Sequence, residues 1–246
     1  FRHDHPNRPL ILALTGTDLY QDLRESEEAQ ASLELADALI VLQPEAVEEL
    51  PERHRARAHV VYQSVVLPPR AAELVDDRER FAPRRTFDVM VIGHLRAVKD
   101  PMRTALAARL LPAQSRVRIL HCGAAMDDEH EALARHELEV NPRYKWLGEV
   151  PRWRVLRMLA RSPLFVHTSR LEGGANALGE ALACAAPVIA SDIPGNTGLL
   201  GRDYPALFPV GDTEALAGLL RRAETDPAFL EDLHHRSQAQ RPLFTP

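Results

Sequence analysis

The segment RLEGGANALGEALACAAPVIASD, residues 170–192, contains the turn, the helix and the strand of a parallel α/β unit. Glu172 and Glu180 stand eight positions apart, and a glycine pair follows the first glutamate directly. The alanine-rich stretch after the glycines predicts a helix, and the apolar run PVIA predicts a buried strand. Because the run LFVH before the segment also predicts a strand, the helix links two strands, as it does in parallel sheets.

The same alternation of apolar runs and helical patterns extends along the whole chain, which is typical of βαβ units and a mainly parallel sheet. The sequence therefore predicts an α/β fold of Rossmann-like character. We expect strands at residues 10–14, 38–42, 59–63, 87–92, 117–120, 145–147, 164–167, 187–190 and 206–209.

The pattern breaks over residues 66–85, where prolines and charges interrupt it, and this stretch is predicted to be an interdomain linker. Residues 1–84 would then form an N-terminal Rossmann-like domain with its linker, and residues 85–246 a C-terminal one. Since the first apolar run already looks like an inner strand, we expect the N-terminal domain to be incomplete in this chain. Ligands of such sheets bind at the carboxyl ends of the strands.

Composition narrows the classes of function. With 246 residues, a net charge of −5 and 45% hydrophobic residues, the chain has a globular composition, and its acidic balance argues against nucleic acid as a partner. No apolar run approaches the roughly 20 residues of a membrane span, so we expect no membrane insertion and a cytoplasmic location. Cys122 and Cys184 are predicted core residues, and the histidines at 3–5 and 234–235 are not spaced as zinc ligands, so no metal or other cofactor is expected.

The turn after Glu172 is suited to a phosphate. Free amides and the positive end of a helix dipole attract phosphate, and small residues let it approach the backbone. We therefore expect the backbone to bind the diphosphate through residues Gly173, Gly174, Ala175, Asn176 and Ala177. The alternative is a plain turn, because glycine pairs and acidic residues near helix starts are common.

Glu180 is predicted to face the ligand. Leu178, Ala181 and Leu182 belong to the apolar stripe of the helix, whereas Asn176 and Glu180 fall outside it, four residues apart. A carboxylate at this position can accept two hydrogen bonds from a cis-diol such as a ribose.

The segment Glu172, GGANALG, Glu180, ALACAAPVIAS closely resembles the motif of retaining GT-B glycosyltransferases of family 4. This resemblance implies a fold of two Rossmann-like domains facing a cleft, and a UDP-sugar as substrate. It implies that Glu180 holds the ribose and that Glu172, as a catalytic residue, contacts the donor sugar with the amides after it. Gly174 replaces the aromatic residue that is usual in the family, which affects the shape of the sugar pocket.

A second motif, VIGHLRAVKDP at residues 91–101, resembles the basic loop with which this family binds the donor phosphates. Lys99 aligns with the family's lysine, His94 stands where an arginine is usual, and Arg96 can supply that charge. Lys99 and Arg96 would stabilise the leaving diphosphate. Lys99 is one of only two lysines in an arginine-rich chain, which indicates a need for a compact ammonium group, although a solvated loop lysine is the alternative.

A third motif, WLGEV at residues 146–150, resembles the turn whose backbone contacts the nucleotide base in the family. Glu149 and Val150 are the candidates, through their main-chain groups. A plain strand end is equally compatible with this sequence.

On the N-terminal side, the first strand leads into Thr15, Gly16, Thr17 and Asp18, which we expect to face the donor domain and either bind the acceptor or help the leaving group. The alternative is a helix cap, for which Thr and Asp are well suited. His94 and Arg170 complete the acceptor candidates as cationic groups near the donor motif.

Four segments together resemble one branch of the family, the selenosugar synthases of selenoneine biosynthesis: LTGTDLYQDL at residues 14–23, SLELADALIVLQ at 32–43, VIGHLRAVKDP at 91–101, and the segment 169–201 around the two glutamates. That resemblance implies transfer of the sugar of a UDP-sugar to selenophosphate with formation of a carbon–selenium bond. The alternatives are a family 4 enzyme that uses a sugar or lipid hydroxyl, a nucleotide-sugar binder without transfer activity, and an epimerase.

Overall fold

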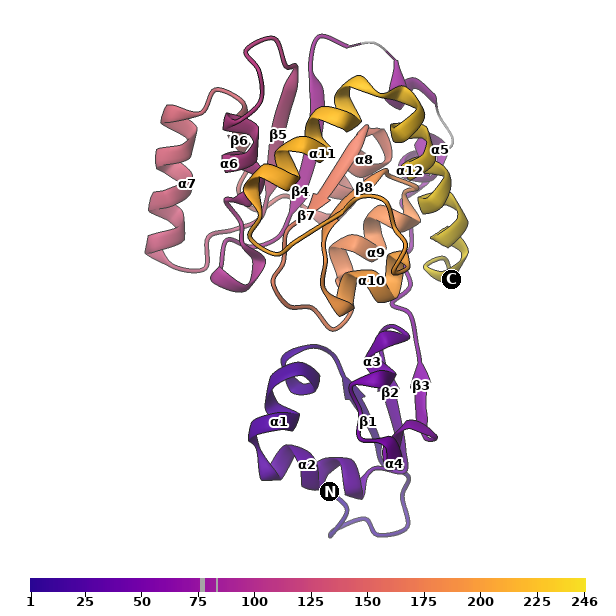
Figure 1. The fold of residues 1–246 in the computed structure, drawn as a ribbon. Helices are drawn as coiled ribbons and strands as arrows, with labels where there is room; N and C mark the ends of the chain where they lie inside the picture. Colours follow the sequence, from indigo (N-terminus) through magenta and orange to yellow (C-terminus); the bar gives the residue numbers. More distant parts are fainter. Residues whose placement is uncertain (76–77, 83) are drawn as a thin grey trace.

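The computed structural model describes residues 1–75, 78–82 and 84–246, and it contains two parallel sheets (Figure 1). The smaller sheet has the order β1-β2-β3, formed by β1 (Ile11–Leu14), β2 (Ala38–Val41) and β3 (Ala58–Val60). The larger sheet has the order β6-β5-β4-β7-β8-β9. Its strands are β4 (Phe87–Ile92), β5 (Val117–Cys122), β6 (Tyr144–Trp146), β7 (Leu164–His167), β8 (Val188–Ser191) and β9 (Leu207–Phe208). The predicted α/β class and every predicted strand are confirmed, with shifts at the strand ends.

The smaller unit is built around the three strands. Its helices are the π-helix η1 (Asp18–Asp22), α1 (Leu23–Glu25), α2 (Glu27–Leu35), α3 (Glu45–Glu48) and α4 (Glu52–Arg55). The Ser26 hydroxyl accepts a hydrogen bond from the amide of Ala29 and so begins α2. Leu14, Leu33 and Leu39 are buried in the core of this unit.

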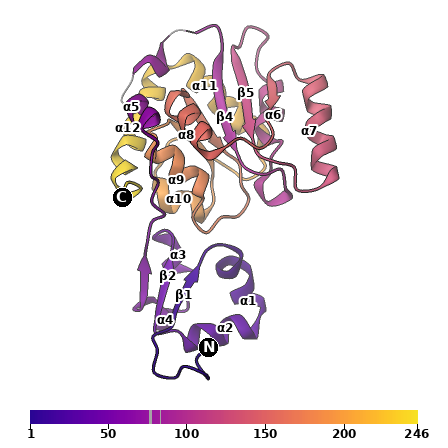
Figure 2. The ribbon, with the colours of Figure 1, turned by 180° about the vertical axis from the view of Figure 1, so that it is seen from behind.

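The larger unit carries helices on both faces of its sheet. Figures 1 and 2, seen from opposite sides, show α11 in front of the strands in one view and α8 in the other. The helices that follow β4 in this unit are η3 (Ala97–Lys99), α6 (Arg103–Arg109), α7 (Asp128–Val140), α8 (Arg152–Arg161), α9 (Asn176–Ala183), α10 (Pro194–Leu200), α11 (Thr213–Thr225), α12 (Pro227–Gln240) and η4 (Arg241–Leu243).

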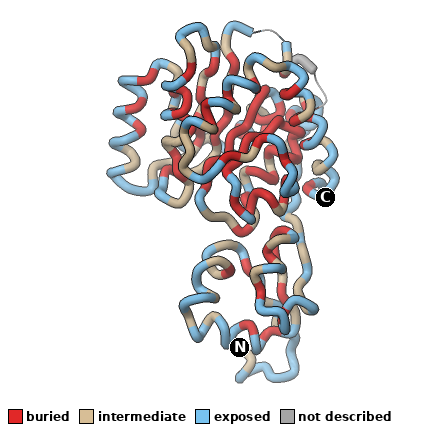
Figure 3. Tube along the Cα trace, viewed as in Figure 1, coloured by how far each residue is buried: buried red, intermediate tan, exposed pale blue. Residues whose placement is uncertain are grey.

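Because helices cover both faces of this sheet, the central strands β7 and β8 are apolar except for His167 and Ser191 at their carboxyl ends. Every residue of β7 and of β8 is buried, and Figure 3 shows the buried trace concentrated in the middle of this unit.

The described part of the predicted linker packs against the larger unit. It contains α5 (Pro69–Val75) and the 3₁₀ helix η2 (Arg78–Phe81), and Ala71 and Val75 are fully buried in the core of the larger unit. The Arg80 guanidinium donates to the carbonyls of Ala160 at 2.7 Å and Ala185 at 2.8 Å. Residues 76, 77 and 83 of the predicted linker lie outside the described residues, and the domain boundary near residue 84 stays a prediction.

The chain also returns to the connection between the sheets at its C-terminal end. Phe244 is buried, its ring lies edge-on to Tyr62 at 5.6 Å between centroids, and its carbonyl accepts from the amide of Val65 at 2.7 Å. Within the described part of the chain, none of the helices has the length and apolar character that crossing a membrane requires.

Candidate active site

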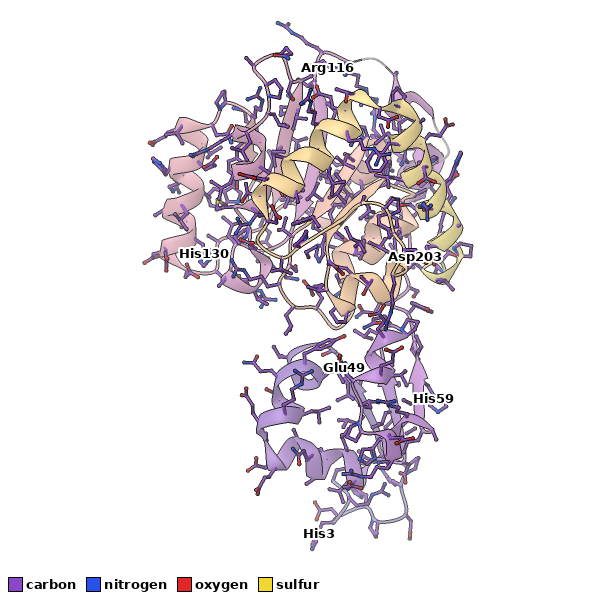
Figure 4. All side chains as sticks on the ribbon, viewed as in Figure 1. His3, Glu49, His59, Arg116, His130 and Asp203 are labelled. Carbon is purple, nitrogen blue, oxygen red and sulfur yellow. The ribbon has the colours of Figure 1, made fainter. Side chains whose placement is uncertain are left out.

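A cavity of about 1030 Å³ lies beyond the carboxyl ends of β4 and β5, where Ile92, Gly93, Cys122 and Gly123 line it. Residues of the smaller unit line it too, and Figure 4 shows side chains of both units extending into the space between the ribbons. Eleven predicted site residues line the cavity: Thr15, His94, Arg96, Lys99, Glu149, Val150, Glu172, Gly174, Asn176, Ala177 and Glu180. Six others do not: Gly16, Thr17, Asp18, Arg170, Gly173 and Ala175.

Lys99 and Glu172, 73 residues apart in sequence, form an ion pair in which Nζ of Lys99 donates to Oε1 of Glu172. The short helix η3 ends at Lys99, and Gly93 packs against its stem, with the Cβ position of the glycine 3.9 Å from Cδ of Lys99. Both side chains are largely buried, with 20% and 13% of their surface exposed. Lys99 and Glu172, two of the three predicted catalytic residues, therefore meet in the cavity, and the third, Arg96, also lines it.

Glu172 is strongly acidic here. Burial raises its pKa, but the ring of His167 and the ammonium of Lys99 outweigh that effect and lower the pKa from 4.5 to about 2. Nε2 of His167 lies 3.5 Å from Oε1 of Glu172 and has no hydrogen-bond partner among the described residues. Sequence reasoning missed His167; its polar character at the end of an otherwise apolar strand was the available signal.

Glu180 lies off the buried stripe of α9, as predicted. Leu178, Ala181 and Leu182 are fully buried, whereas the Glu180 carboxylate reaches the cavity and accepts a hydrogen bond of 2.6 Å from Nε of Arg152. Arg152 was not predictable as a partner of Glu180, because it begins a different helix, 28 residues earlier.

Close packing of three strand ends brings Glu149 and Val150 to the cavity. Gly148 has a φ of 66°, a conformation that favours glycine, and its carbonyl accepts from the amide of Gly123 at 2.8 Å. A Cβ on Gly123 would lie 1.9 Å from the carbonyl oxygen of Gly93. Contact of the main chain at 149 and 150 with a base remains a prediction.

The glycine pair serves the contact between the two units. A Cβ on Gly173 would lie 2.0 Å from the carbonyl oxygen of Thr15, and one on Gly174 would lie 2.5 Å from Cβ of Leu42. Gly174 still lines the cavity, but Gly173 does not, and Ala175 is buried. Phosphate contact through Gly173 and Ala175 stays a prediction, whereas the close approach explains the glycines directly.

Asp18 accepts hydrogen bonds from the backbone of the turn after β1. Its carboxylate accepts from the amides of Thr15 at 2.7 Å, Gly16 at 2.6 Å and Leu19 at 2.9 Å. Those bonds hold the turn after β1, and contact of Asp18 with an acceptor stays a prediction. The Thr17 side chain does not cap the following helix. Of the four predicted residues, Thr15 lines the cavity, whereas Gly16, Thr17 and Asp18 do not.

The cationic residues proposed to bind the acceptor do not all lie in the cavity. His94 and Arg96 line the cavity and are exposed, and Nδ1 of His94 accepts from the amide of Ala124 at 3.2 Å. Arg170 instead lies 3.5 Å from Oδ1 of Asp100, outside the cavity lining. Asp100 also bonds Arg103 at 2.9 Å, so Arg170 belongs to a cluster that holds the Lys99 loop.

Neither a metal-binding group nor a reactive thiol is found among the described residues. No group of three or more His, Cys, Asp and Glu side chains within them is arranged to hold a metal ion, and independence of metal stays a prediction. Both cysteines are free and buried, as predicted, and burial raises the pKa of Cys122 to about 11 and that of Cys184 to about 12.

A parallel sheet with charged side chains gathered in a cavity beyond its carboxyl edge defines an α/β protein of Rossmann-like architecture, in which ligands bind at that edge. The sequence matches the model of the family "Glycosyl transferases group 1" over residues 75–241, and the chain belongs to this family.

Two relatives with curated descriptions match parts of the chain. TuaC of Bacillus subtilis (strain 168), described as a teichuronic acid biosynthesis glycosyltransferase, is 35% identical over 97 residues, which is 38% of this chain and 25% of TuaC. The glycosyltransferase 1 domain-containing protein 1 of Xenopus tropicalis is 25% identical over 225 residues, which is 86% of this chain and 65% of the relative. This chain therefore spans a quarter of one relative and just under two thirds of the other.

Solved structures share the fold. The structure of Anabaena Alr3699/HepE in complex with UDP and glucose matches with a TM-score of 0.76 at 19% identity, covering 97% of this chain and 68% of that one. An α,α-trehalose-phosphate synthase (UDP-forming) from Burkholderia vietnamiensis matches with a TM-score of 0.77 at 15% identity, covering 98% and 66%. The α/β architecture of the GT-B glycosyltransferases is thus shared by this chain.

Proposed function

We propose that the protein is a glycosyltransferase that uses a UDP-sugar as donor. The observation that carries this proposal is the meeting of Glu172, Lys99 and Glu180 in one cavity beyond the strand ends. Three separate motifs predicted these residues and the turn at 149–150 as parts of a nucleotide-sugar site. UDP in the Anabaena structure and UDP formation in the name of the Burkholderia protein support the choice of nucleotide.

In this proposal Glu180 accepts hydrogen bonds from the ribose hydroxyls, and the turn at 149–150 contacts the base. Lys99, with Arg96 at the rim, neutralises the diphosphate as its charge grows in the transition state. Because these cations supply the charge, we propose a reaction that needs no metal ion. Adding EDTA should then leave the rate of UDP release unchanged.

For the acceptor we propose selenophosphate, in line with the resemblance to selenosugar synthases. Its selenium attacks the anomeric carbon of the donor, a carbon–selenium bond forms, the bond from that carbon to the UDP oxygen breaks, and UDP leaves with the electron pair. Such an acceptor is already nucleophilic and needs no general base. A Glu172 with a pKa of about 2 is a poor base for a hydroxyl proton, which supports an anionic acceptor.

The test is an assay of UDP release from UDP-sugars with selenophosphate, followed by mass spectrometry of the product. A selenium-bearing sugar supports the full proposal. UDP release only in the presence of a sugar or lipid alcohol would indicate a glycosyltransferase that uses a hydroxyl acceptor instead of selenophosphate. A new sugar nucleotide without UDP release would indicate an epimerase, and UDP-sugar binding without reaction a binding module.

Location is part of the same proposal. We propose that the protein works in the cytoplasm, since two buried free thiols suit a reducing compartment.

A further inference from the structure

A second cavity, of about 350 Å³, is lined by residues of α8 and of strands β4 and β5. It shares no lining residue with the active-site cavity. Four of its ten lining residues are arginines, namely Arg84, Arg154, Arg157 and Arg161. We call this cavity the arginine groove.

Three of the arginines form a stripe on α8. Arg154, Arg157 and Arg161 are spaced by three and four residues, which places them on one face of the helix along about 10 Å. The other side of α8 carries Leu156 and Leu159, which are buried in the core.

These guanidinium groups lack ionic partners. Across the residues that the structure describes, the side chains of Arg154, Arg157 and Arg161 make no hydrogen bond or ion pair. By contrast, Arg152 on the same helix bonds Glu180, and Arg118 bonds Asp88 with two contacts of 2.7 and 2.8 Å. The acidic chain thus leaves three positive charges uncompensated at one place.

The stripe also opposes local helix stability. Like charges three and four residues apart repel each other, and Arg154 stands in the first turn, where the helix dipole disfavours a cation. No acidic residue in that turn offsets it. Local conflicts of this kind gather at functional sites, and a bound anion would remove the conflict.

The interior of the arginine groove is apolar. Met90, Leu120 and Met158 line it, and Trp153, 56% exposed, stands at its edge. Its one carboxylate, that of Asp88, is already bonded by Arg118. The volume lies at the small end of the range of small-molecule sites.

We propose that the arginine groove binds a phosphate ester that carries an apolar group. Guanidinium groups bind phosphate oxygens through paired hydrogen bonds, and the methionines and the tryptophan contact the apolar part. The phosphate ester is either a soluble metabolite or the headgroup of a lipid; the chemistry of recognition is the same. This site is independent of the proposed glycosyl transfer.

The test measures binding of hexyl phosphate by calorimetry, with hexanol and inorganic phosphate as comparisons, and flotation with phosphatidylcholine vesicles that contain or lack phosphatidic acid. The groove variant R154Q/R157Q/R161Q is compared with R8Q/R70Q/R221Q, which removes three exposed arginines outside the groove. The single variant R161Q keeps the test valid should the triple variant unfold in thermal denaturation.

We expect the wild-type protein to bind hexyl phosphate or the anionic vesicles, and the groove variant to lose about ten-fold or more of that affinity. The control variant should keep it. Binding to hexyl phosphate alone identifies a soluble ligand, and binding to vesicles alone a lipid. Absence of binding to either probe, or an equal loss in the control variant, would overturn the proposal. UDP binding, measured in parallel, should stay unchanged in the groove variant and so separates this site from the active site.

Discussion

The Nε of Arg152 donates a hydrogen bond of 2.6 Å to Oε1 of Glu180 and thereby joins the start of α8 to the first turns of α9. Only Pro151 separates Arg152 from the turn at 149–150, so one ion pair links the helix that follows the proposed base-binding turn with the proposed ribose carboxylate. Only 13% of the Glu180 side chain is exposed, against 57% of Arg152. The pair thus holds the carboxylate at the cavity wall while the guanidinium stays in solvent.

Glu180→Ala should weaken UDP binding by about 1.5–3 kcal/mol, because hydrogen bonds from the ribose to a charged group are lost. The fold should persist, since the side chain lies off the buried stripe of α9. Isothermal calorimetry with UDP measures the change. Unchanged UDP affinity in a folded variant would show that Glu180 does not bind the ribose.

Arg152→Ala should have a smaller effect on UDP affinity, about 1 kcal/mol or less, because the exposed guanidinium is screened by solvent. Arg154→Ala, two positions along the same helix and outside the active-site cavity, is the matched control and should bind UDP like the wild type. A loss with Arg152→Ala that equals or exceeds that of Glu180→Ala would contradict this ranking.

Lys99→Ala should lower kcat by about 100-fold while changing donor KM little, since charge on the leaving diphosphate grows in the transition state. Lys145, the only other lysine of the chain, lies on β6 and supplies the control Lys145→Ala. Steady-state kinetics at saturating UDP-sugar measures the effect. If kcat is the same in both variants, Lys99 does not stabilise the leaving group.

The pKa of Glu172 predicts a pH dependence of stability. The folded state lowers this pKa from 4.5 to about 2, so the ionised carboxylate stabilises the fold fully above about pH 4.5. That contribution, about 3 kcal/mol at most, is lost as the pH falls from 4.5 towards 2.

Glu172→Gln should therefore lose less stability than the wild type between pH 6 and about pH 3. Urea unfolding at the two pH values gives both free energies, and Glu129→Gln, at an exposed position of α7, is the control. Equal pH dependence in wild type and Glu172→Gln would refute the assignment of this carboxylate.

Gly173→Ala should destabilise the contact between the units, because the new Cβ would lie 2.0 Å from the Thr15 carbonyl oxygen. We expect a loss of about 1–3 kcal/mol in the free energy of unfolding, as in overpacked cores. Gly218→Ala in α11 meets nothing within 4 Å and should be neutral or stabilise by up to about 1 kcal/mol. Chemical denaturation compares the two, and equal stability of both variants would be the contrary result.

The strands were predictable because buried parallel strands are continuous apolar runs, and residues 87–92 and 164–167 match to the residue. The third strand was placed at 59–63, whereas β3 ends at Val60. β3 is the edge strand of a small sheet and pairs with β2 over three residues only, so the apolar run continues beyond its pairing. Pairing length depends on the partner strand and cannot be read from local composition.

Candidate site residues that belong to sequence motifs could be predicted. Glu172, Glu180 and Lys99 stand in motifs with fixed spacing, and the structure brings all three to the cavity. Arg170 was placed beside the acceptor on charge alone, yet its contact with Asp100 keeps it outside the lining. His167 was missed for the opposite reason, since its approach to Glu172 exists only once the strand and the following turn have folded.

Gly174 approaches Leu42 so closely that the side-chain volumes tolerated at these two positions, 132 residues apart, depend on each other. Alanine at 174 alone would collide with the leucine, and a small residue at 42 alone would leave a void, but the two changes together restore the fit. In a library randomised at both positions, tolerated sequences should therefore show inverse covariation in side-chain volume. Exchange of the smaller unit between homologues would succeed only when residue 174 is exchanged with it.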